Sequence, residues 1–283
     1  MPSIDIMTQG SPELDTFARQ VDATLAGADV RTAFWRCSDA FEALVASGFL
    51  RQVAHGFLQR MLATPTDGSS QWQMQHAVLI QRSSHALRAT WNVIDIPPDT
   101  TIPSHPSHCM LHTVGIEPTI IDMYRLPAID REVFQTGAML EYSHQVVLGP
   151  GQTLEIDGEH WVADPQSGTC NCLISFNSAA IGSQVWSFDR ATKQSWAVSA
   201  ASAEDTQIKE TLGILRRFGL KEAAPAVERL CAHPHHDIRW EAIKTLGVLD
   251  AALAVERLRQ ARSDAHPHVR ASAARTLSTL QAG

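Results

Sequence analysis

Two stretches of this sequence, residues 98–109 and 148–160, carry histidines close after turns rich in proline or glycine. The first contains His105 and His108, and the second ends on His160. Imidazole nitrogens bind Fe, Zn, Cu and Ni, so histidines from two strands that meet in space can hold one ion. The two stretches therefore predict the halves of a mononuclear metal site, and such sites carry out oxygen chemistry.

The spacing within the first stretch decides whether both of its histidines reach the same ion. Side chains alternate between the faces of a strand, so His105 and His108 would point to opposite faces of a regular strand. Both can bind one ion only if Pro106 marks a bulge or if the strand begins after it. His112 and His144 are reserve ligands that the pattern places on strand walls.

Three zones of different pattern must position these histidines. Residues 1–70 predict a helical segment, which begins where Ser11, Pro12 and Glu13 supply an N-cap, a first-turn proline and a first-turn acid. Residues 71–200 predict many short strands separated by Pro, Gly, Asp and Ser, which is typical of a sandwich or barrel. The predicted strands are 77–80, 90–94, 119–121, 145–148 and 172–176.

Residues 204–283 predict a third zone, built from repeated helices. Ala-Val-Glu-Arg-Leu occurs at 226–230 and again at 254–258, and a His-Pro turn follows each copy. Ile238 and Val269, 31 residues apart, begin matching helices. Paired amphipathic helices at a near-constant step are the mark of a solenoid, and these resemble short HEAT-like repeats. Repetition of the unit also accounts for a group of five histidines without a metal: His233, His235, His236, His266 and His268.

The bulk properties exclude several classes of function. The chain has 283 residues, of which 44% are hydrophobic, and a formal net charge of -7, which argues against a nucleic-acid-binding protein. No run approaches the roughly 18 apolar residues of a membrane span. The N-terminus lacks the pattern of a signal peptide. Five cysteines are few for this length and indicate reduced thiols in a cytoplasm.

Four motifs between about Phe41 and Ser199 resemble the cupin superfamily, and more closely its cysteine dioxygenase-like thiol dioxygenases. They are LIQR at 79–82, IPSHPSHC at 102–109, GEHWV at 158–162 and WSFDRATK at 186–193. The resemblance implies a mainly β cupin barrel, a double-stranded β-helix or jelly roll, over residues 71–200. N-terminal helices over 1–70 would pack on it, and the C-terminal α-helical HEAT-like repeats over 204–283 would follow.

The resemblance also implies a set of site residues. The family binds one Fe(II) through three histidines and adds both atoms of O₂ to a small thiol, whose carboxylate is held by an arginine. Carried over, His105 and His160 are iron ligands, with His108 compensating for a missing one, and Arg82 is the carboxylate clamp. A fork-shaped guanidinium suits a carboxylate bidentately. Cys109 matches a cysteine that some members crosslink to a tyrosine, and is the implied catalytic residue.

The sequence departs from the family at three points. The His-x-His pair is absent, and either Pro103 or Ser107 stands where a ligand is expected. The strand at 173–177 supplies no tyrosine for Cys109, and it lacks the family's serine and histidine near the substrate. These departures weigh against thiol dioxygenation and leave another oxidation open.

Two functions of different class therefore remain open. One is a mononuclear Fe(II) cupin oxygenase acting on a small thiol or an amino-acid-like carboxylate, with Ni, Mn or Zn as other possible metals. The other is a catalytically degenerate cupin that binds a ligand or acts as a scaffold, while the repeats dock a protein partner. Ring nitrogens converging about 2 Å from one point would favour the enzyme. Divergence of His105 and His108 around a filled cavity would favour the scaffold.

Overall fold

The computed structural model describes residues 11–63, 72–73, 76–91, 100–166 and 172–282. They fall into two compact units. The first unit takes in residues 1–128 and 136–197, and the second takes in residues 129–135 and 198–283. No helix among the described residues is long and apolar enough to cross a membrane.

The first unit begins with short helices that an N-cap starts at the predicted place. The Oγ of Ser11 accepts a hydrogen bond from the backbone N–H of Leu14 at 3.5 Å, which confirms the predicted start of the first helix. The helices are α1 (Pro12–Leu25), α2 (Val30–Ala33), the 3₁₀ helix η1 (Phe34–Cys37), α3 (Ser38–Ala46) and α4 (Phe49–Ala63).

Antiparallel strands follow, in three sheets with the orders β1-β2-β3-β10-β5-β8, β12-β11-β4 and β7-β6-β9. Their bounds are β1 (Trp72–Gln73), β2 (His76–Gln81), β3 (His85–Trp91), β4 (Thr101–Pro103), β5 (Cys109–Val114), β6 (Thr119–Arg125), β7 (Glu141–Leu148), β8 (Thr153–Ile156), β9 (Trp161–Pro165), β10 (Cys172–Ser178), β11 (Gln184–Asp189) and β12 (Ser195–Ala200). The predicted runs at 77–80, 119–121, 145–148 and 172–176 lie inside four of these strands. The remaining predicted run is 90–94. Its residues Thr90 and Trp91 end β3, and residues 92–94 lie outside the described residues.

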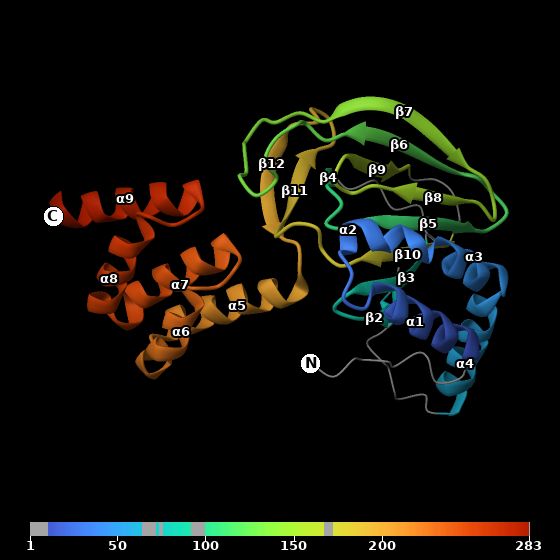
Figure 1. Cartoon of the computed structure of the whole chain (residues 1–283), viewed down its shortest axis with the longest axis horizontal. Coiled ribbons are helices and arrows are strands. Elements are labelled where there is room, and N and C mark those ends of the chain that lie inside the picture. The colour runs from blue at the N-terminus through green and yellow to red at the C-terminus, as the bar shows by residue number, and fades with distance from the viewer. Residues whose placement is uncertain (1–10, 64–71, 74–75, 92–99, 167–171, 283) are drawn as a thin grey trace. The chain divides into compact units, whose positions relative to one another are not determined.

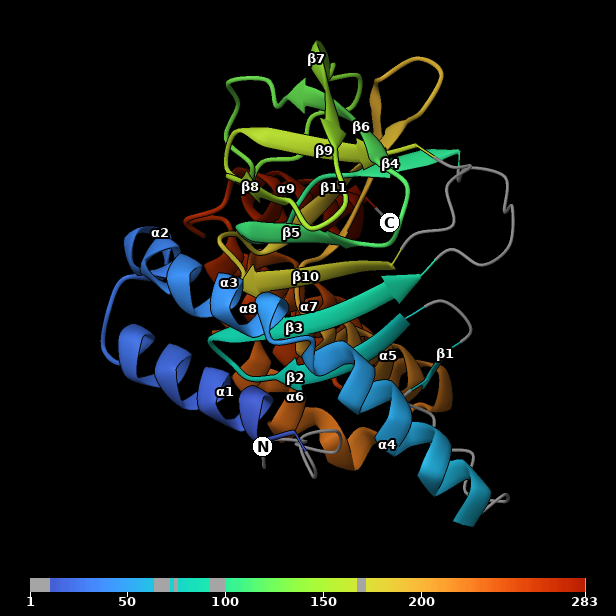
Figure 2. The same cartoon turned by 90° about the vertical axis from the view of Figure 1, so that its right-hand side faces the viewer.

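The six-stranded sheet carries a different core on each face. Met110, Ile174 and Phe176 pack with the N-terminal helices, which cover this face in Figures 1 and 2. Cys109 and Leu111, which alternate with Met110 on β5, pack on the other face with residues of β6, β7, β8 and β9. The space between the six-stranded sheet and the β7-β6-β9 sheet is therefore occupied by apolar side chains.

The second unit is built from helices in pairs. They are α5 (Ala203–Phe218), the 3₁₀ helix η2 (Lys221–Ala223), α6 (Ala224–Leu230), α7 (His236–Leu249), α8 (Ala251–Ala261) and α9 (Pro267–Ala282). Residues at the predicted step of 31 have matching burial in α7 and α9: Ile238 and Val269 are 0% and 1% exposed, and Ala242 and Ala273 are both 0% exposed. The periodic sequence therefore produces equivalent packing.

Candidate metal centre

His105 and His108 lie in the connection between β4 and β5, and their rings point to different partners. The Nε2 atom of His105 accepts a hydrogen bond from the backbone N–H of Ala163 on β9 at 3.1 Å. The lone pair of His105 Nε2 is therefore engaged in a hydrogen bond to the protein backbone.

The ring of His108 lies on the face of the six-stranded sheet that the helices cover. It is 3% exposed and packs 5.1 Å from the ring of Trp35, beside Phe34. Its Nδ1 is 3.1 Å from Oδ1 of Asp157, but the ring is not oriented for an aligned hydrogen bond, and both ring nitrogens are buried without one. Burial lowers the pKa of His108, against the charge of Asp157. His108 is thus a neutral, buried imidazole with unused lone-pair capacity.

Asp157 follows β8 and brings His160 to the same place. Its Oδ2 accepts a hydrogen bond from Nδ1 of His160 at 2.7 Å, and its Oδ1 accepts one from the backbone N–H of Glu159 at 3.0 Å. Burial alone would raise the pKa of Asp157, but these hydrogen bonds and the neighbouring His108 hold it below its usual range. The carboxylate is therefore ionised at neutral pH and lies between two imidazoles.

The two stretches that the sequence predicts to form one site do meet in the structure. A Cβ added to Gly158 would lie 2.1 Å from the backbone oxygen of Ser107 and 3.2 Å from Cβ of His105. Glycine at this position is what lets the turn at 157–160 approach the connection at 105–108.

The remaining predicted residues lie elsewhere. Burial raises the pKa of Cys109 to about 12, so its thiol stays protonated within the apolar cluster. His112 contacts the Oγ1 of Thr153 at 3.0 Å and lies edge-on to Phe41. His144 is exposed and lies edge-on to Trp161, with ring centroids 5.7 Å apart.

Arg82, the predicted clamp for a carboxylate, faces a carboxylate of the protein itself. Its Nε lies 3.9 Å from Oδ2 of Asp22 on α1. The guanidinium beside the histidine group is instead that of Arg31, whose Nε lies 3.1 Å from Oε1 of Glu159. Sequence reasoning missed both Asp157 and Arg31. The only signal was an acid three residues before His160 in a turn sequence, Asp-Gly-Glu-His.

Because of the buried side chain of His85, beside Arg82, we expect the protein to lose stability in acid. Burial lowers its pKa to about 4, below the 6.5 of an unfolded histidine, with Asp22 opposing and Arg82 adding to the shift. Because the unfolded chain binds the proton first, this stability is complete above pH 6.5 and lost as pH falls towards 4, by roughly 3 kcal/mol. His85→Leu is expected to flatten this part of the pH profile of urea unfolding. The exposed His55→Gln should leave it unchanged, and an equal slope in both variants would contradict the assignment.

The donor set that converges therefore differs from the one that the resemblance implies. His105, His108 and His160 do not direct three ring nitrogens to one point, since Nε2 of His105 is taken by Ala163. His108 and His160 contact different oxygens of Asp157, and the potential ligand atoms that lie within 4.8 Å of one another are those of Asp157, Glu159 and His160. One imidazole and two carboxylates, with the imidazole of His108 on the far oxygen of Asp157, are donors that suit a divalent transition metal. A three-histidine centre does not fit these residues.

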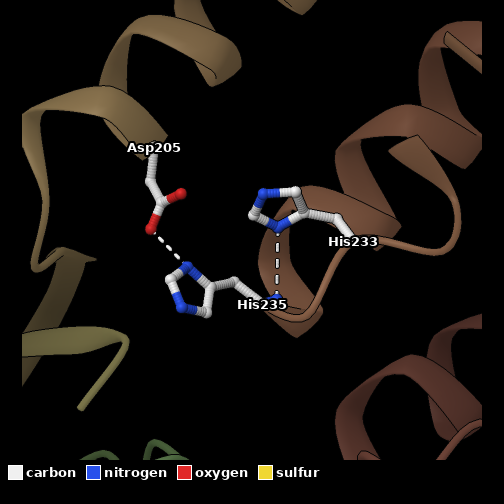
Figure 3. A group of neighbouring side chains, drawn as sticks. All are labelled: Asp205, His233 and His235. Carbon is white, nitrogen blue, oxygen red and sulfur yellow. Dashed lines mark hydrogen bonds and ion pairs between the residues drawn. The ribbon is translucent and has the colours of Figure 1, made fainter. Parts of the chain in front are cut away.

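A second histidine group lies in the helical unit. Asp205 of α5 is buried and contacts Nδ1 of His235, while Nδ1 of His233 accepts a hydrogen bond from the backbone N–H of His235 at 3.2 Å (Figure 3). Potential ligand atoms of these three residues lie within 4.8 Å of one another. The bond to Nδ1 leaves the proton of a neutral His233 on Nε2, so a metal at this group would have to replace the hydrogen bond that closes the turn.

The same group recurs one repeat later with its residue types exchanged. At the step of 31, Asp264 replaces His233 and accepts the backbone N–H of His266 at 2.7 Å. His236 replaces Asp205 and stacks on His266, with ring centroids 3.5 Å apart. Both groups close a turn between helices, which supports the prediction that repetition explains these histidines.

The C-terminal part of the chain matches a known family. Residues 194–280 match the family model of HEAT repeats. The predicted HEAT-like repeats are thereby confirmed for this part of the chain. No curated protein sequence matches the chain significantly.

The structure is also similar to several solved structures, all weakly. FeII HppE shares 17% identity at a TM-score of 0.24, over 36% of this chain and 48% of its own. Vicilin from Corylus avellana shares 14% at 0.27, over 42% and 32%, and an RmlC-like cupin from Shewanella frigidimarina shares 10% at 0.22, over 38% and 76%. The chain thus spans less than half the length of the first two, and at these TM-scores the likeness carries no argument about function.

Proposed function

We propose that the β-rich unit binds one divalent transition metal, with Fe(II) the best fit, through His108, Asp157 and His160, and acts as a mononuclear non-haem oxygenase. The observation that carries the proposal is the group at the turn after β8, where potential ligand atoms of Asp157, Glu159 and His160 lie within 4.8 Å of one another. His108 contacts the same carboxylate, with its Nδ1 3.1 Å from Oδ1 of Asp157. We further infer that the three sheets form a cupin-like barrel.

The donor set supports iron over the other metals. Two histidines and one carboxylate with open positions are the ligands of non-haem Fe(II) oxygenases, where the metal activates O₂ when it is bound. The protein supplies a buried neutral imidazole in His108, an ionised carboxylate in Asp157 and an exposed imidazole in His160. His108 lacks an aligned hydrogen bond at either nitrogen, and a metal ligated by Nδ1 would satisfy one of them.

Arg31 supports a substrate that carries a carboxylate. Its side chain is 59% exposed and pairs with Glu159, two residues beyond Asp157. A small carboxylate next to the metal would compete with Glu159 for this guanidinium, which binds carboxylates bidentately. Arg82 and Cys109 are not part of the proposal, because Asp22 pairs with the first and the apolar cluster buries the second.

Metal loading of the purified protein tests the proposal. We expect about one equivalent of Fe(II), or of Zn²⁺ as a redox-inert probe, by anaerobic titration and elemental analysis. His160→Ala and Asp157→Asn should each weaken binding by at least about 10-fold, while the exposed His55→Ala should bind as the unsubstituted chain does. His105→Ala discriminates between donor sets, since it should keep the metal. No stoichiometric metal, or loss of it only in His105→Ala, would overturn the proposal.

A second candidate function is a docking role for the C-terminal repeats. The match of residues 194–280 to HEAT repeats supports it, because stacked helix pairs present extended surfaces to other proteins. The divergence of His105 and His108 and the apolar side chains that fill the space between the sheets also favour this second candidate, a degenerate β-rich unit that acts as a scaffold with the repeats. The metal proposal rests instead on the separate group of donors at 157–160.

A further inference from the structure

A group of potential metal ligands in the helical unit is separate from the group at 157–160. It consists of Asp205 of α5 and of His233 and His235, which lie in the turn before α7. Potential ligand atoms of the three residues lie within 4.8 Å of one another. Figure 3 shows both imidazole rings beside the carboxylate of Asp205. We call these three residues the repeat site.

The carboxylate of Asp205 is the buried member of the repeat site. Its side chain is 5% exposed, and its Oδ2 contacts Nδ1 of His235. Among the residues that the structure describes, His235 is the one ion-pair partner of this carboxylate. A buried carboxylate that no guanidinium or ammonium group neutralises is a favourable place for a cation.

The next repeat has the same residue types at the equivalent positions but arranges them differently. Asp264, 31 residues after His233, accepts hydrogen bonds from the guanidinium of Arg239 at 2.8 Å and 2.6 Å. His236 and His266 stack on each other, with ring centroids 3.5 Å apart. Repetition therefore explains why both turns carry histidines, but only the first turn has its carboxylate open to a cation.

We propose that the repeat site binds Zn²⁺ through a carboxylate oxygen of Asp205, Nδ1 of His235 and Nε2 of His233, with water in the fourth position. Imidazole and carboxylate are both zinc ligands, and three protein ligands with one open position are an established zinc arrangement. The ion joins α5 to the turn before α7 and so links two helix pairs of the stack. This proposal is independent of the metal at 157–160 and of the docking role of the repeats.

Each imidazole can present a lone pair to the ion without a change in the number of protons. Nδ1 of His235 becomes a ligand when its proton moves to Nε2, and the side chain is 36% exposed, so water reaches the ring. In Figure 3 the nitrogen of His233 on the side of Asp205 is Nε2, because Nδ1 bonds to the backbone of His235.

His233 gives up one hydrogen bond when it binds the ion. Its proton moves from Nε2 to Nδ1, which can then no longer accept the backbone N–H of His235. That hydrogen bond is 3.2 Å long, at the weak end of the range for proteins. Coordination of the ion by three ligands replaces it, so we expect zinc to bind in spite of the loss.

Zinc titration of the full chain tests the repeat site, in the Asp157→Asn background that removes the ion proposed at 157–160. We expect this chain to bind about one equivalent of Zn²⁺, by competition with a chromophoric chelator and by elemental analysis. Asp205→Asn, which keeps the shape of the side chain, and His235→Ala should each weaken this binding at least about 10-fold. His268→Ala, at an exposed histidine of the next turn, should bind zinc as the background chain does.

A stability measurement distinguishes the repeat site from adventitious binding elsewhere on the chain. Because the ion joins two elements that are apart in the unfolded chain, it stabilises the folded second unit. Zn²⁺ at about 100-fold above its Kd should raise the thermal midpoint of that unit by roughly 10 °C in the Asp157→Asn chain. Addition of Asp205→Asn should abolish this shift.

Every other outcome overturns the proposal. An Asp157→Asn chain that binds no zinc, or whose zinc affinity and thermal shift survive Asp205→Asn, would show that the repeat site holds no ion. Equal loss of zinc in His268→Ala would place the ion at the next turn.

Failure of the metal proposal at 157–160 gives a different result. The unsubstituted chain would then bind about one equivalent of zinc that Asp205→Asn removes and Asp157→Asn spares. If both proposals hold, the unsubstituted chain binds about two equivalents. Metal titrations of the group at 157–160 are therefore best made in the Asp205→Asn chain, where that group is the expected ligand set.

Discussion

Gly158→Ala is expected to lower the thermal midpoint of the first unit by roughly 10 °C and to abolish metal binding. The new methyl group would lie 2.1 Å from the backbone oxygen and 2.8 Å from the backbone carbon of Ser107. No side-chain rotation relieves a contact with backbone, so the turn at 157–160 must move away from the connection at 105–108. Such a movement costs about 3 kcal/mol and separates Asp157 from His108.

Gly213→Ala is the matched control for that experiment. Gly213 lies within α5, and an added Cβ would meet nothing within 4 Å. Alanine in a helix interior is favoured over glycine, so this variant should stabilise the second unit by about 0.5–1 kcal/mol. Circular dichroism melts of both variants, with metal titration of each, make the comparison. A Gly158→Ala protein that melts with the unsubstituted chain and keeps its metal would show that the two stretches do not touch.

The elements that local sequence controls were predictable. Ser11 is an N-cap because its side chain can accept a backbone N–H three residues on, and this requires nothing from the rest of the chain. The strands followed from short apolar runs between turn residues. The repeats followed from a period, because equivalent residues such as Ile238 and Val269 must meet equivalent neighbours in a stack of similar units.

The site was only partly predictable, because a ligand set is a tertiary property. Residue type alone singles out His108 and His160, and both contact the carboxylate of Asp157. Asp157 was missed because an acid in a turn is ordinarily a hydrogen-bond acceptor for the turn itself, a role that it also performs. A motif predicts a role for Arg82, but its partner Asp22 comes from a helix 60 residues earlier. No residue near Arg82 in the sequence indicates that it contacts Asp22.

Divergence of His105 and His108 illustrates the same limit. Strand alternation predicts opposite faces, and the structure has both residues in a connection, where alternation does not apply. The two rings nonetheless point to different partners. The backbone of Ala163 holds the ring of His105, while Phe34 and Trp35 pack beside the ring of His108. The aromatic residues of the N-terminal helices thus decide where His108 points, and the site depends on how firmly those helices are attached.

Phe176→Ala is expected to weaken that attachment and to destabilise the first unit by about 4 kcal/mol. Phe176 of β10 is 0% exposed, and its ring contacts four others from outside its strand. Their centroid distances are 4.8 Å to Phe34, 5.1 Å to Phe17, 5.6 Å to Phe41 and 5.9 Å to His85. Truncation to a methyl group leaves a cavity where three helical elements meet the six-stranded sheet.

The size and the location of the effect can be separated by two further variants. Phe176→Leu fills most of the cavity and should cost about 1.5 kcal/mol or less, whereas the 70% exposed Phe218→Ala should change stability by no more than about 0.5 kcal/mol. Urea unfolding gives these free energies. Because Phe34 contacts both Phe176 and His108, Phe176→Ala should also weaken metal binding under conditions where the chain stays folded. Full metal affinity in a destabilised Phe176→Ala protein would mean that the helices support the fold but do not hold His108 in place.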